Sequence, residues 1–226
     1  NWSSGKDSAL ALHYLQQDNE YDIDLLLSTI NAANDRVAMH GTQSELLKAQ
    51  AEATGLKLSL LELPEQPSME EYNSIMKNEI LRLKDLGYKY SGFGDIFLED
   101  IRQYREAMLS PIGIKPVFPL WKKDSSALMH DFLEQGFRTV IVAAKANLMH
   151  KEFLGQELTK ELLKELPKKI DPCGENGEFH TFCFDGPIFQ EPVKFTLGEK
   201  VYKTYPNPDK KSAQKEIGFW FCDLRG

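Results

Sequence analysis

The sequence has few cysteines and no long hydrophobic run. Its three cysteines, Cys173, Cys183 and Cys222, are odd in number and lack C-x-x-C spacing, which is typical of reduced thiols in a cytoplasmic protein rather than of a disulfide framework. The longest apolar runs, such as Thr139 to Ala144, are too short to cross a bilayer, and no signal peptide is visible. We therefore expect a cytoplasmic protein with no membrane partner.

An excess of positive charge is also lacking. The formal net charge of −7 disfavours a broad electrostatic surface for nucleic acid, and the lysines Lys168, Lys169, Lys210 and Lys211, the one local basic patch, are interpreted as solvated. With 226 residues, of which 42% are hydrophobic and 27% charged, the chain can bury one good core and a second small one.

The first residues form a loop of small side chains that runs into an apolar-periodic stretch. Small residues let backbone N–H groups approach phosphate oxygens, the helix dipole adds positive potential, and Lys6 supplies a point charge. A Walker A loop needs Lys followed directly by Ser or Thr, whereas Asp7 separates Lys6 from Ser8 here. The pattern predicts an exposed phosphate-binding loop of another class, and a capped helix with a surface Lys-Asp pair is the plainer alternative.

Residues Ser3 to Ser8 resemble the PP-loop of the ATP pyrophosphatases, usually Ser-Gly-Gly-x-Asp-Ser, with Ser4 in place of the first glycine. Serine tolerates a positive φ less well than glycine, so the sequence does not decide the backbone conformation at Ser4. Such a loop follows a β-strand, of which roughly five or six residues are expected upstream. We expect the native protein to begin before Asn1.

Helical and strand patterns alternate over the first two thirds of the chain. Capping boxes are predicted at Thr42 with Glu45 and at Ser68 with Glu71. This alternation predicts a parallel sheet wound on both faces by helices. The helices are expected at residues 8–16, 42–54, 68–87, 99–109 and 125–135, and the strands at 24–30, 58–63, 88–93 and 139–143.

Beyond about Pro167 the chain changes to short strands, expected at 193–197, 200–205 and 217–224, with an antiparallel arrangement. A domain boundary is placed near Pro116 to Trp121. The sequence therefore predicts an ATP-binding domain over residues 1–120 and a smaller C-terminal α+β substrate domain over residues 121–226.

In an open α/β sheet, ligands bind beyond the carboxyl ends of the strands. The opening loop, residues 28–31 and the pair Gly94 and Asp95 should therefore converge. Asp95 could meet Mg²⁺ or a nucleotide hydroxyl, and its alternative role is a turn or N-cap aspartate after Gly94.

The segment from Asp171 to Phe182 contains several chemically active side chains between loop-forming glycines: Glu175, Asn176, Glu178, His180 and Thr181. Such density suits binding or proton transfer. A metal site is weakly indicated, because Cys173, His180 and Cys183 have unfamiliar spacings and no fourth ligand is evident. A Cys/His nucleophile pair is weaker still, and a turn followed by a strand is the structural alternative.

Together these motifs resemble the diphthine–ammonia ligase family of PP-loop ATP-binding proteins. The resemblance is carried by the opening loop, by Gly92-Phe93-Gly94-Asp95, by the turn Met39-His40-Gly41, by Pro119-Leu120-Trp121 and, most specifically, by residues 174–181. It implies a nucleotide α-hydrolase (HUP-like) fold. Family chemistry cleaves ATP between its α and β phosphates, forms an acyl-adenylate, and lets ammonia displace AMP to leave an amide.

The resemblance also implies a role for each matching residue. The nucleotide-binding set is Ser3, Ser4, Gly5, Lys6, Asp7, Ser8, Gly94 and Asp95, with Asp7 and Asp95 as Mg²⁺ ligands. The acceptor and ammonia set is Glu175, Asn176, Glu178, His180 and Thr181. Lys6, Asp7, Glu178 and His180 are the residues expected to be catalytic.

The acceptor itself is open. The family's named reaction amidates diphthine on elongation factor 2. The motifs of this sequence, however, resemble those of the bacterial branch, in which diphthamide is not expected. We expect ATP, ammonia and a small or protein-borne carboxylate as partners, a homodimer among the assemblies to be tested, and no nucleic acid. The alternatives are a PP-loop enzyme that modifies RNA and a nucleotide sensor without turnover.

Overall fold

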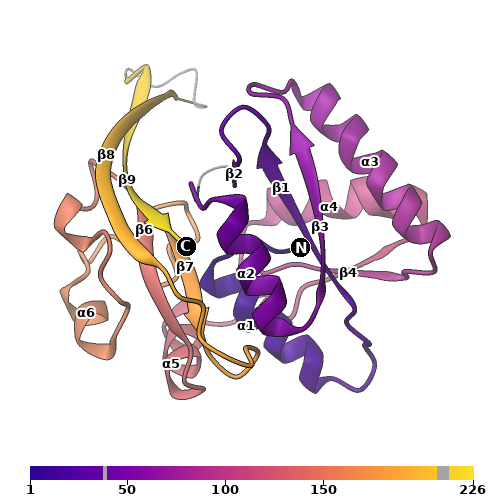
Figure 1. The fold of residues 1–226 in the computed structure, drawn as a ribbon, viewed down its shortest axis with the longest axis horizontal. Coiled ribbons are helices and arrows are strands. Elements are labelled where there is room, and N and C mark those ends of the chain that lie inside the picture. Colours follow the sequence, from indigo (N-terminus) through magenta and orange to yellow (C-terminus); the bar gives the residue numbers. More distant parts are fainter. Residues whose placement is uncertain (38–39, 208–213) are drawn as a thin grey trace.

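The computed structural model describes residues 1–37, 40–207 and 214–226, so Met39, Lys210 and Lys211 lie outside the described residues. Its helices and strands alternate as far as β6 and end in three successive strands (Figure 1). In chain order the elements are α1 (Lys6–Gln17), β1 (Leu25–Asn31), β2 (Arg36–Val37), α2 (Ser44–Thr54), β3 (Lys57–Leu63), α3 (Met69–Asp85), β4 (Tyr90–Gly92), α4 (Glu99–Leu109), the 3-10 helix η1 (Ser110–Ile112), β5 (Lys115–Val117), α5 (Ser125–Glu134), β6 (Arg138–Lys145), η2 (Lys151–Phe153), α6 (Lys160–Glu165), β7 (Phe179–Asp185), β8 (Thr196–Pro206) and β9 (Glu216–Arg225).

The N-terminal half contains parallel strand pairs, as the alternating pattern predicts. Strand β1 pairs with β3 in parallel, with β2 as a short antiparallel neighbour, and β4 pairs with β5 in parallel. The first two residues lie between these pairs: Trp2 N donates to Leu27 O at 2.7 Å, and the Asn1 amine donates to Gly92 O at 2.7 Å. The opening segment therefore connects β1 to β4 and leads directly into the loop before α1.

The C-terminal half contains a four-stranded antiparallel sheet in the order β7-β6-β9-β8. Strand β6 pairs antiparallel with β7 and with β9, so the prediction that residues 139–143 extend the parallel sheet is wrong. Its run of buried apolar side chains suits either kind of sheet, because both faces of this strand are covered. The fold is thus a mixed α/β arrangement with parallel elements and a C-terminal strand region.

Local capping signals gave one right and one wrong helix start. Ser68 Oγ accepts from Glu71 N at 3.1 Å and the Glu71 side chain accepts from Ser68 N, which confirms the capping box of α3. The box predicted at Thr42 and Glu45 is wrong, because α2 begins at Ser44 after Gln43 and no side chain caps it. Thr42 instead bonds the hydroxyl of Ser4, so a tertiary contact has replaced the local one.

The C-terminal strands also differ from the prediction. The separate strands expected at 193–197 and 200–205 are wrong as drawn: residues 193–195 lie outside any strand, and residues 196–206 form one strand, β8. Residues 179–185 form a further strand, β7, which completes the sheet beside β6. No helix within the described ranges has the length and apolarity that a membrane span requires.

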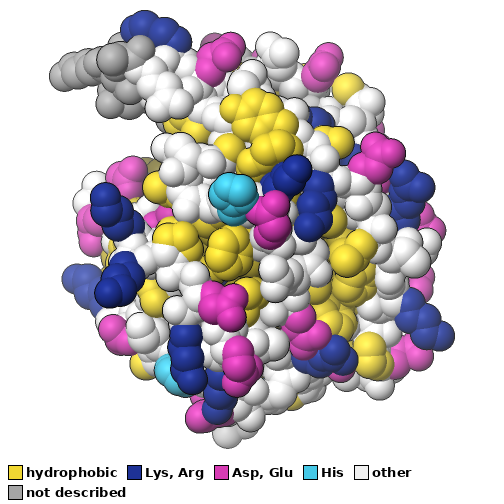
Figure 2. All heavy atoms as spheres, turned by 90° about the vertical axis from the view of Figure 1, so that its left-hand side faces the viewer, with side chains coloured by type: hydrophobic (Ala, Val, Ile, Leu, Met, Phe, Trp, Pro, Cys, Tyr) yellow, Lys and Arg dark blue, Asp and Glu magenta, His cyan; other side chains and the backbone are white. Residues whose placement is uncertain are grey.

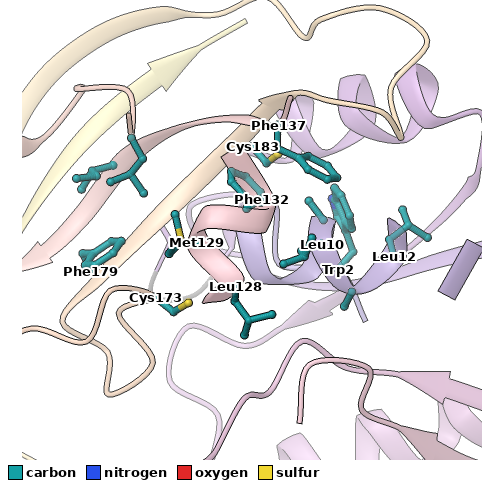
Figure 3. Close-up of a cluster of buried hydrophobic side chains, with 14 of the residues drawn as sticks. Trp2, Leu10, Leu12, Leu128, Met129, Phe132, Phe137, Cys173, Phe179 and Cys183 are labelled. Atoms are coloured by element: carbon teal, nitrogen blue, oxygen red, sulfur yellow. The ribbon is translucent and has the colours of Figure 1, made fainter. Parts of the chain in front are cut away.

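The main core joins the two halves around α1. Buried side chains of α1 pack with those of α5 and of the strands that follow, and the close-up in Figure 3 shows Leu10 and Trp2 facing Phe132 and Phe137. The rings of Phe132 and Phe137 stack at 4.8 Å between centroids. A second cluster fills the space between α3, η1 and the parallel strands. Helix α1 is therefore held from both sides, and the loop at its N-terminus is fixed in place.

One fully buried glutamine cross-links three segments behind that loop. Gln50 of α2 accepts a hydrogen bond from Trp2 Nε1 at 2.8 Å and donates to Ser4 O at 3.0 Å and to Cys183 O at 2.6 Å. Buried polar groups cost free energy unless they are paired, so all three partners depend on this amide. Gln50 thereby ties the opening loop to α2 and β7.

We predict that Gln50→Glu lowers the free energy of unfolding by about 2–5 kcal/mol, because a carboxylate cannot donate to the two carbonyls and would be buried. Urea unfolding followed by circular dichroism measures the change. Gln16→Glu on the exposed end of α1 is the matched control and should shift the midpoint little. Equal midpoints for the two variants would contradict the cross-link.

Candidate active site

The opening loop adopts the tight path that a phosphate loop requires. Ser4 has φ of +72°, the left-handed conformation usually taken by glycine, so serine occupies it here without a change of path. Its carbonyl accepts from Cys183 N at 2.8 Å, and its hydroxyl lies 3.0 Å from Thr42 Oγ1. Gly5 then forms the N-cap of α1, which aims the N-terminus of the helix at the loop.

Lys6 is buried rather than exposed, which corrects the expectation of a wholly exposed loop. Only 3% of its surface is accessible, and its Nζ lies 2.8 Å from both oxygens of Asp7 and also donates to Cys173 O. Burial lowers the pKa of the Lys6 ammonium, but the Asp7 carboxylate more than offsets this, and the pKa is raised overall. For Asp7, burial raises the pKa of the carboxyl, and the positive charge of Lys6 offsets this increase only in part.

A cavity of about 570 Å³ lies beside this ion pair, within the range of small-molecule sites. It extends from the ends of β1 and β2 past the opening loop to α3 and α4. Seven of the residues singled out in the sequence line it, and they come from three separate segments: Ser3, Asp7, Ser8, Gly94, Asp95, Glu175 and His180. Ser28 and Thr29 also line it, as the strand-end argument predicts.

Gly94 brings the second segment against the first. A Cβ at this position would lie 2.8 Å from both C and O of Asp7, so only glycine permits the approach. Asp95 follows and forms a bidentate ion pair with Arg105, whose Nε and Nη2 lie 2.6 and 3.1 Å from its oxygens. Asp95 is not the N-cap of α4, a position that Leu98 takes.

Glu175 belongs to the third segment that reaches the cavity. Its Oε1 accepts from Ile96 N at 2.8 Å and lies 3.4 Å from Phe97 N, so it links the loop before β7 to the residues after Asp95. Asp171 organises that loop, because its Oδ2 accepts from Cys173 N and Glu175 N. Burial raises the pKa of Glu175 to about 7, helped by the negative charge of Asp7.

Glu178 and His180 hold buried polar atoms without a partner. Glu178 Oε1 accepts from Asn176 Nδ2 and Asp171 N, whereas Oε2 has no hydrogen bond among the described residues, and neither does His180 Nε2. Such atoms are expensive to bury and often mark functional positions. Glu178, Asn176 and Thr181 are not among the residues that line the cavity: Asn176 is exposed, whereas Glu178 and Thr181 are buried, and the Thr181 hydroxyl accepts from Lys6 N at 3.1 Å.

His40 and Arg105 line the cavity and were not among the expected site residues. The rings of His40 and His180 lie 4.6 Å apart between centroids, and burial lowers the pKa of His40 to about 4. Burial, with His40 and Lys6 nearby, also holds the pKa of His180 well below its ordinary value. A histidine in the turn before a helix was a visible signal for His40, whereas nothing local distinguished Arg105 on α4.

The alternative chemistries suggested by the cysteines find no supporting geometry. Among the described residues no three His, Cys, Asp or Glu side chains converge as a metal site, so Cys173, His180 and Cys183 do not form one. Burial raises the pKa of the Cys173 thiol to about 12 and also raises that of Cys183, which disfavours a thiolate nucleophile.

These features define an α/β protein with a tight loop of small residues before its first helix and a cavity beside it that is lined by carboxylates. A family model described as diphthamide synthase N-terminal domain matches residues 1–116, and one described as diphthamide synthase C-terminal domain matches residues 124–209. The chain belongs to the diphthamide synthase family, as its motifs predict.

Individual relatives agree with the family models. The chain is 31% identical over 100 residues to diphthine–ammonia ligase of Schizosaccharomyces pombe, an alignment that covers 42% of this chain and 16% of that protein. It is 31% identical over 110 residues to the Danio rerio protein of that name, covering 46% and 43%. The Homo sapiens protein gives 28% over 110 residues, covering 46% and 41%. The aligned region thus spans less than half the length of these relatives.

The raised pKa of Glu175 leads to a prediction about stability and pH. Because the folded chain holds this proton more tightly, the carboxyl contributes stability below its ordinary pKa of 4.5 that is lost as pH rises towards 7. Glu175→Gln does not titrate, so its melting temperature should rise relative to the unmodified chain between pH 4.5 and pH 8.

The exposed Glu165 supplies the control, since Glu165→Gln makes the same change outside the site and is measured over the same range. Differential scanning calorimetry at four or five pH values measures both differences. A pH-independent offset for Glu175→Gln would show that the carboxyl titrates normally.

Proposed function

We propose that this protein is an ATP-dependent amide ligase that adenylates a carboxylate, releases pyrophosphate and transfers ammonia to form the amide. The observation that carries the proposal is the convergence of three segments on one cavity: Asp7 from the opening loop, Asp95 from the end of β4, and Glu175 with His180 from the loop and strand β7. The relatives named diphthine–ammonia ligase support the same reaction class.

The fold and domain division form part of the proposal. A nucleotide α-hydrolase arrangement over residues 1–120 is supported by the parallel pairing of β1 with β3 and of β4 with β5. A substrate domain over residues 121–226 is supported by the antiparallel sheet of β6 to β9. We place the protein in a reducing cytoplasm, to which its three free, buried thiols are suited.

The opening loop is assigned to the β and γ phosphates. The N-terminus of α1 and the Lys6 ammonium provide positive potential there, and a ligand that draws Lys6 away from Asp7 would gain a buried cation. Asp7 and Asp95 line one cavity and provide the carboxylate donors that Mg²⁺ takes alongside phosphate oxygens, so they fit this ion. Bound there, Mg²⁺ would stabilise negative charge on the pyrophosphate that leaves.

The acceptor and ammonia are assigned to the side formed by the segment before β7. The acceptor carboxylate attacks the α phosphorus, the bond to pyrophosphate breaks, and the acyl-adenylate forms. The ammonia nitrogen then attacks the acyl carbon and the bond to AMP breaks. Glu175 and His180 line the cavity and are the groups that take the proton from nitrogen, and we assign Glu178 to a supporting position beside them. The unpartnered Glu178 Oε2 and His180 Nε2 support a polar ligand on this side.

The acceptor stays open within the class of carboxylates. Relatives are named for diphthine, while the proposed bacterial origin of this chain favours another carboxylate. Untargeted mass spectrometry of extracts incubated with the protein, ATP and ¹⁵N-ammonium would identify molecules that gain a labelled amide. An RNA product would favour the RNA-modification alternative.

We predict that turnover converts ATP to AMP and pyrophosphate rather than to ADP and phosphate, because Asp7 interrupts the Walker pattern. The products are measured by ³¹P NMR of a reaction that contains ATP, Mg²⁺, ammonium and a cell-extract fraction that supports turnover. ADP as the main product would refute the proposal, and binding of ATP without turnover in any fraction would favour the sensor alternative.

We predict different losses from the two sides of the cavity. Lys6→Ala or Asp7→Asn should weaken ATP binding about tenfold or more, because each breaks a charge-assisted contact at the loop. Glu178→Gln and His180→Ala should retain ATP binding and lose amide formation. Isothermal titration and amide yield separate the two groups.

Folding must be checked in the same experiment. Lys6→Ala leaves Asp7 without its partner, so a lower melting temperature is also expected for that variant. Lys6→Arg keeps the charge and serves as the milder control. Full ATP-dependent pyrophosphate release by both Lys6→Ala and Asp7→Asn would show that the loop does not hold phosphate.

A further inference from the structure

Strand β8 forms one edge of the C-terminal sheet. It is 11 residues long, and among the described strands it pairs with β9 alone. Every residue of β8 except Gly198 is exposed, and no other strand among the described residues pairs with its outer edge. Long open edges of this kind are normally blocked or paired with another strand.

Exposed apolar side chains concentrate on this strand. Of the nine large hydrophobic side chains that are exposed among the described residues, four belong to β8: Leu197, Val201, Tyr202 and Tyr205. Leu197 and Tyr202 are more than half exposed, at 55% and 53%. Figure 2 views the molecule from the side on which β8 lies in Figure 1, and it shows hydrophobic and charged side chains interspersed there.

We propose that β8 pairs with β8 of a second copy of this chain, antiparallel across a two-fold axis at Val201. Symmetric pairing of this kind uses one surface twice and closes after two subunits. It satisfies the open edge of both sheets and joins them into one continuous sheet. The homodimer does not depend on ligase activity.

The register follows from the length of the strand. Because β8 runs from Thr196 to Pro206, its midpoint is Val201, and an axis there centres the pairing on the strand. The same register sets Glu199 opposite Lys203 of the partner subunit, and the symmetry repeats this pair. Opposite charges placed directly across from each other stabilise a strand pair.

The apolar side chains also find partners in this register. In this register the stem of Lys200 lies opposite Tyr202 of the partner subunit, and the symmetry repeats this pair. A slip of one residue in one direction sets Lys200 opposite Lys203 of the partner subunit, which like charges disfavour. A slip in the other direction leaves Glu199 without an opposite charge.

Lysines on an edge strand usually prevent pairing. Here the proposed register gives each of Lys200 and Lys203 a favourable neighbour, so the same residues select one register. The register shift between Leu197 and Lys200 against β9 bends the start of β8. Residues 199–203 therefore carry the pairing, and the Glu199–Lys203 pairs mark its two ends.

Sedimentation velocity of the purified chain between 1 and 100 µM tests the proposal with a charge exchange. Glu199→Lys and Lys203→Glu should each weaken dimerisation about tenfold or more, since each places like charges opposite one another twice. The double variant restores both pairs in reversed order and should recover most of the affinity. Its recovery distinguishes this register from a general charge effect.

Glu191→Lys and Lys194→Glu are matched controls, since both residues are exposed and lie before β8. They should leave the dimer unchanged, and melting curves should show that all variants fold. A monomer at 100 µM would overturn the proposal. So would a dimer that tolerates both single reversals, or a double variant no better than the singles.

Discussion

The site depends on a buried ion pair at the start of the chain. Lys6 and Asp7 are neighbours, and both point to the place where the opening loop meets the loop before β7. A buried ammonium needs compensation, which comes from a carboxylate and from a carbonyl in the other half of the molecule. Thr181 and Cys183 of β7 bond the same loop through Lys6 N and Ser4 O. The opening loop is therefore completed by the C-terminal sheet.

This construction explains the electrostatics of the cavity. Carboxylates line it from three segments, while the imidazoles of His40 and His180 are kept neutral by burial. The two imidazole rings are tilted against each other, with centroids 4.6 Å apart, whereas burial raises the pKa of the Glu175 carboxyl to about 7. The carboxyl group with the raised pKa is thus the one that also joins two loops.

Sequence reasoning succeeded where the signal was local. The Ser68–Glu71 box lies on an exposed helix end, and nothing competes with it, so its prediction holds. Thr42 carries an equivalent pattern, but its side chain forms a hydrogen bond with the hydroxyl of Ser4 instead of capping the helix. The apolar run of β6 could not reveal its neighbours, because burial on both faces erases the alternation that identifies an antiparallel strand. The sequence did not identify Arg105 as a site residue, because only the folded chain brings it to its partner Asp95.

The contact of Gly94 with the backbone of Asp7 limits how this site can vary. The two loops touch without a side chain between them, so the separation of Asp7 from Asp95 is set by main-chain van der Waals contact. Repacking a neighbouring rotamer cannot tune that separation. Under the proposed function, a different acceptor would have to be accommodated elsewhere in the cavity wall, at positions such as Tyr72, Met76 and Ile101 on α3 and α4. A library aimed at new acceptors would randomise those helix faces and leave the glycine alone.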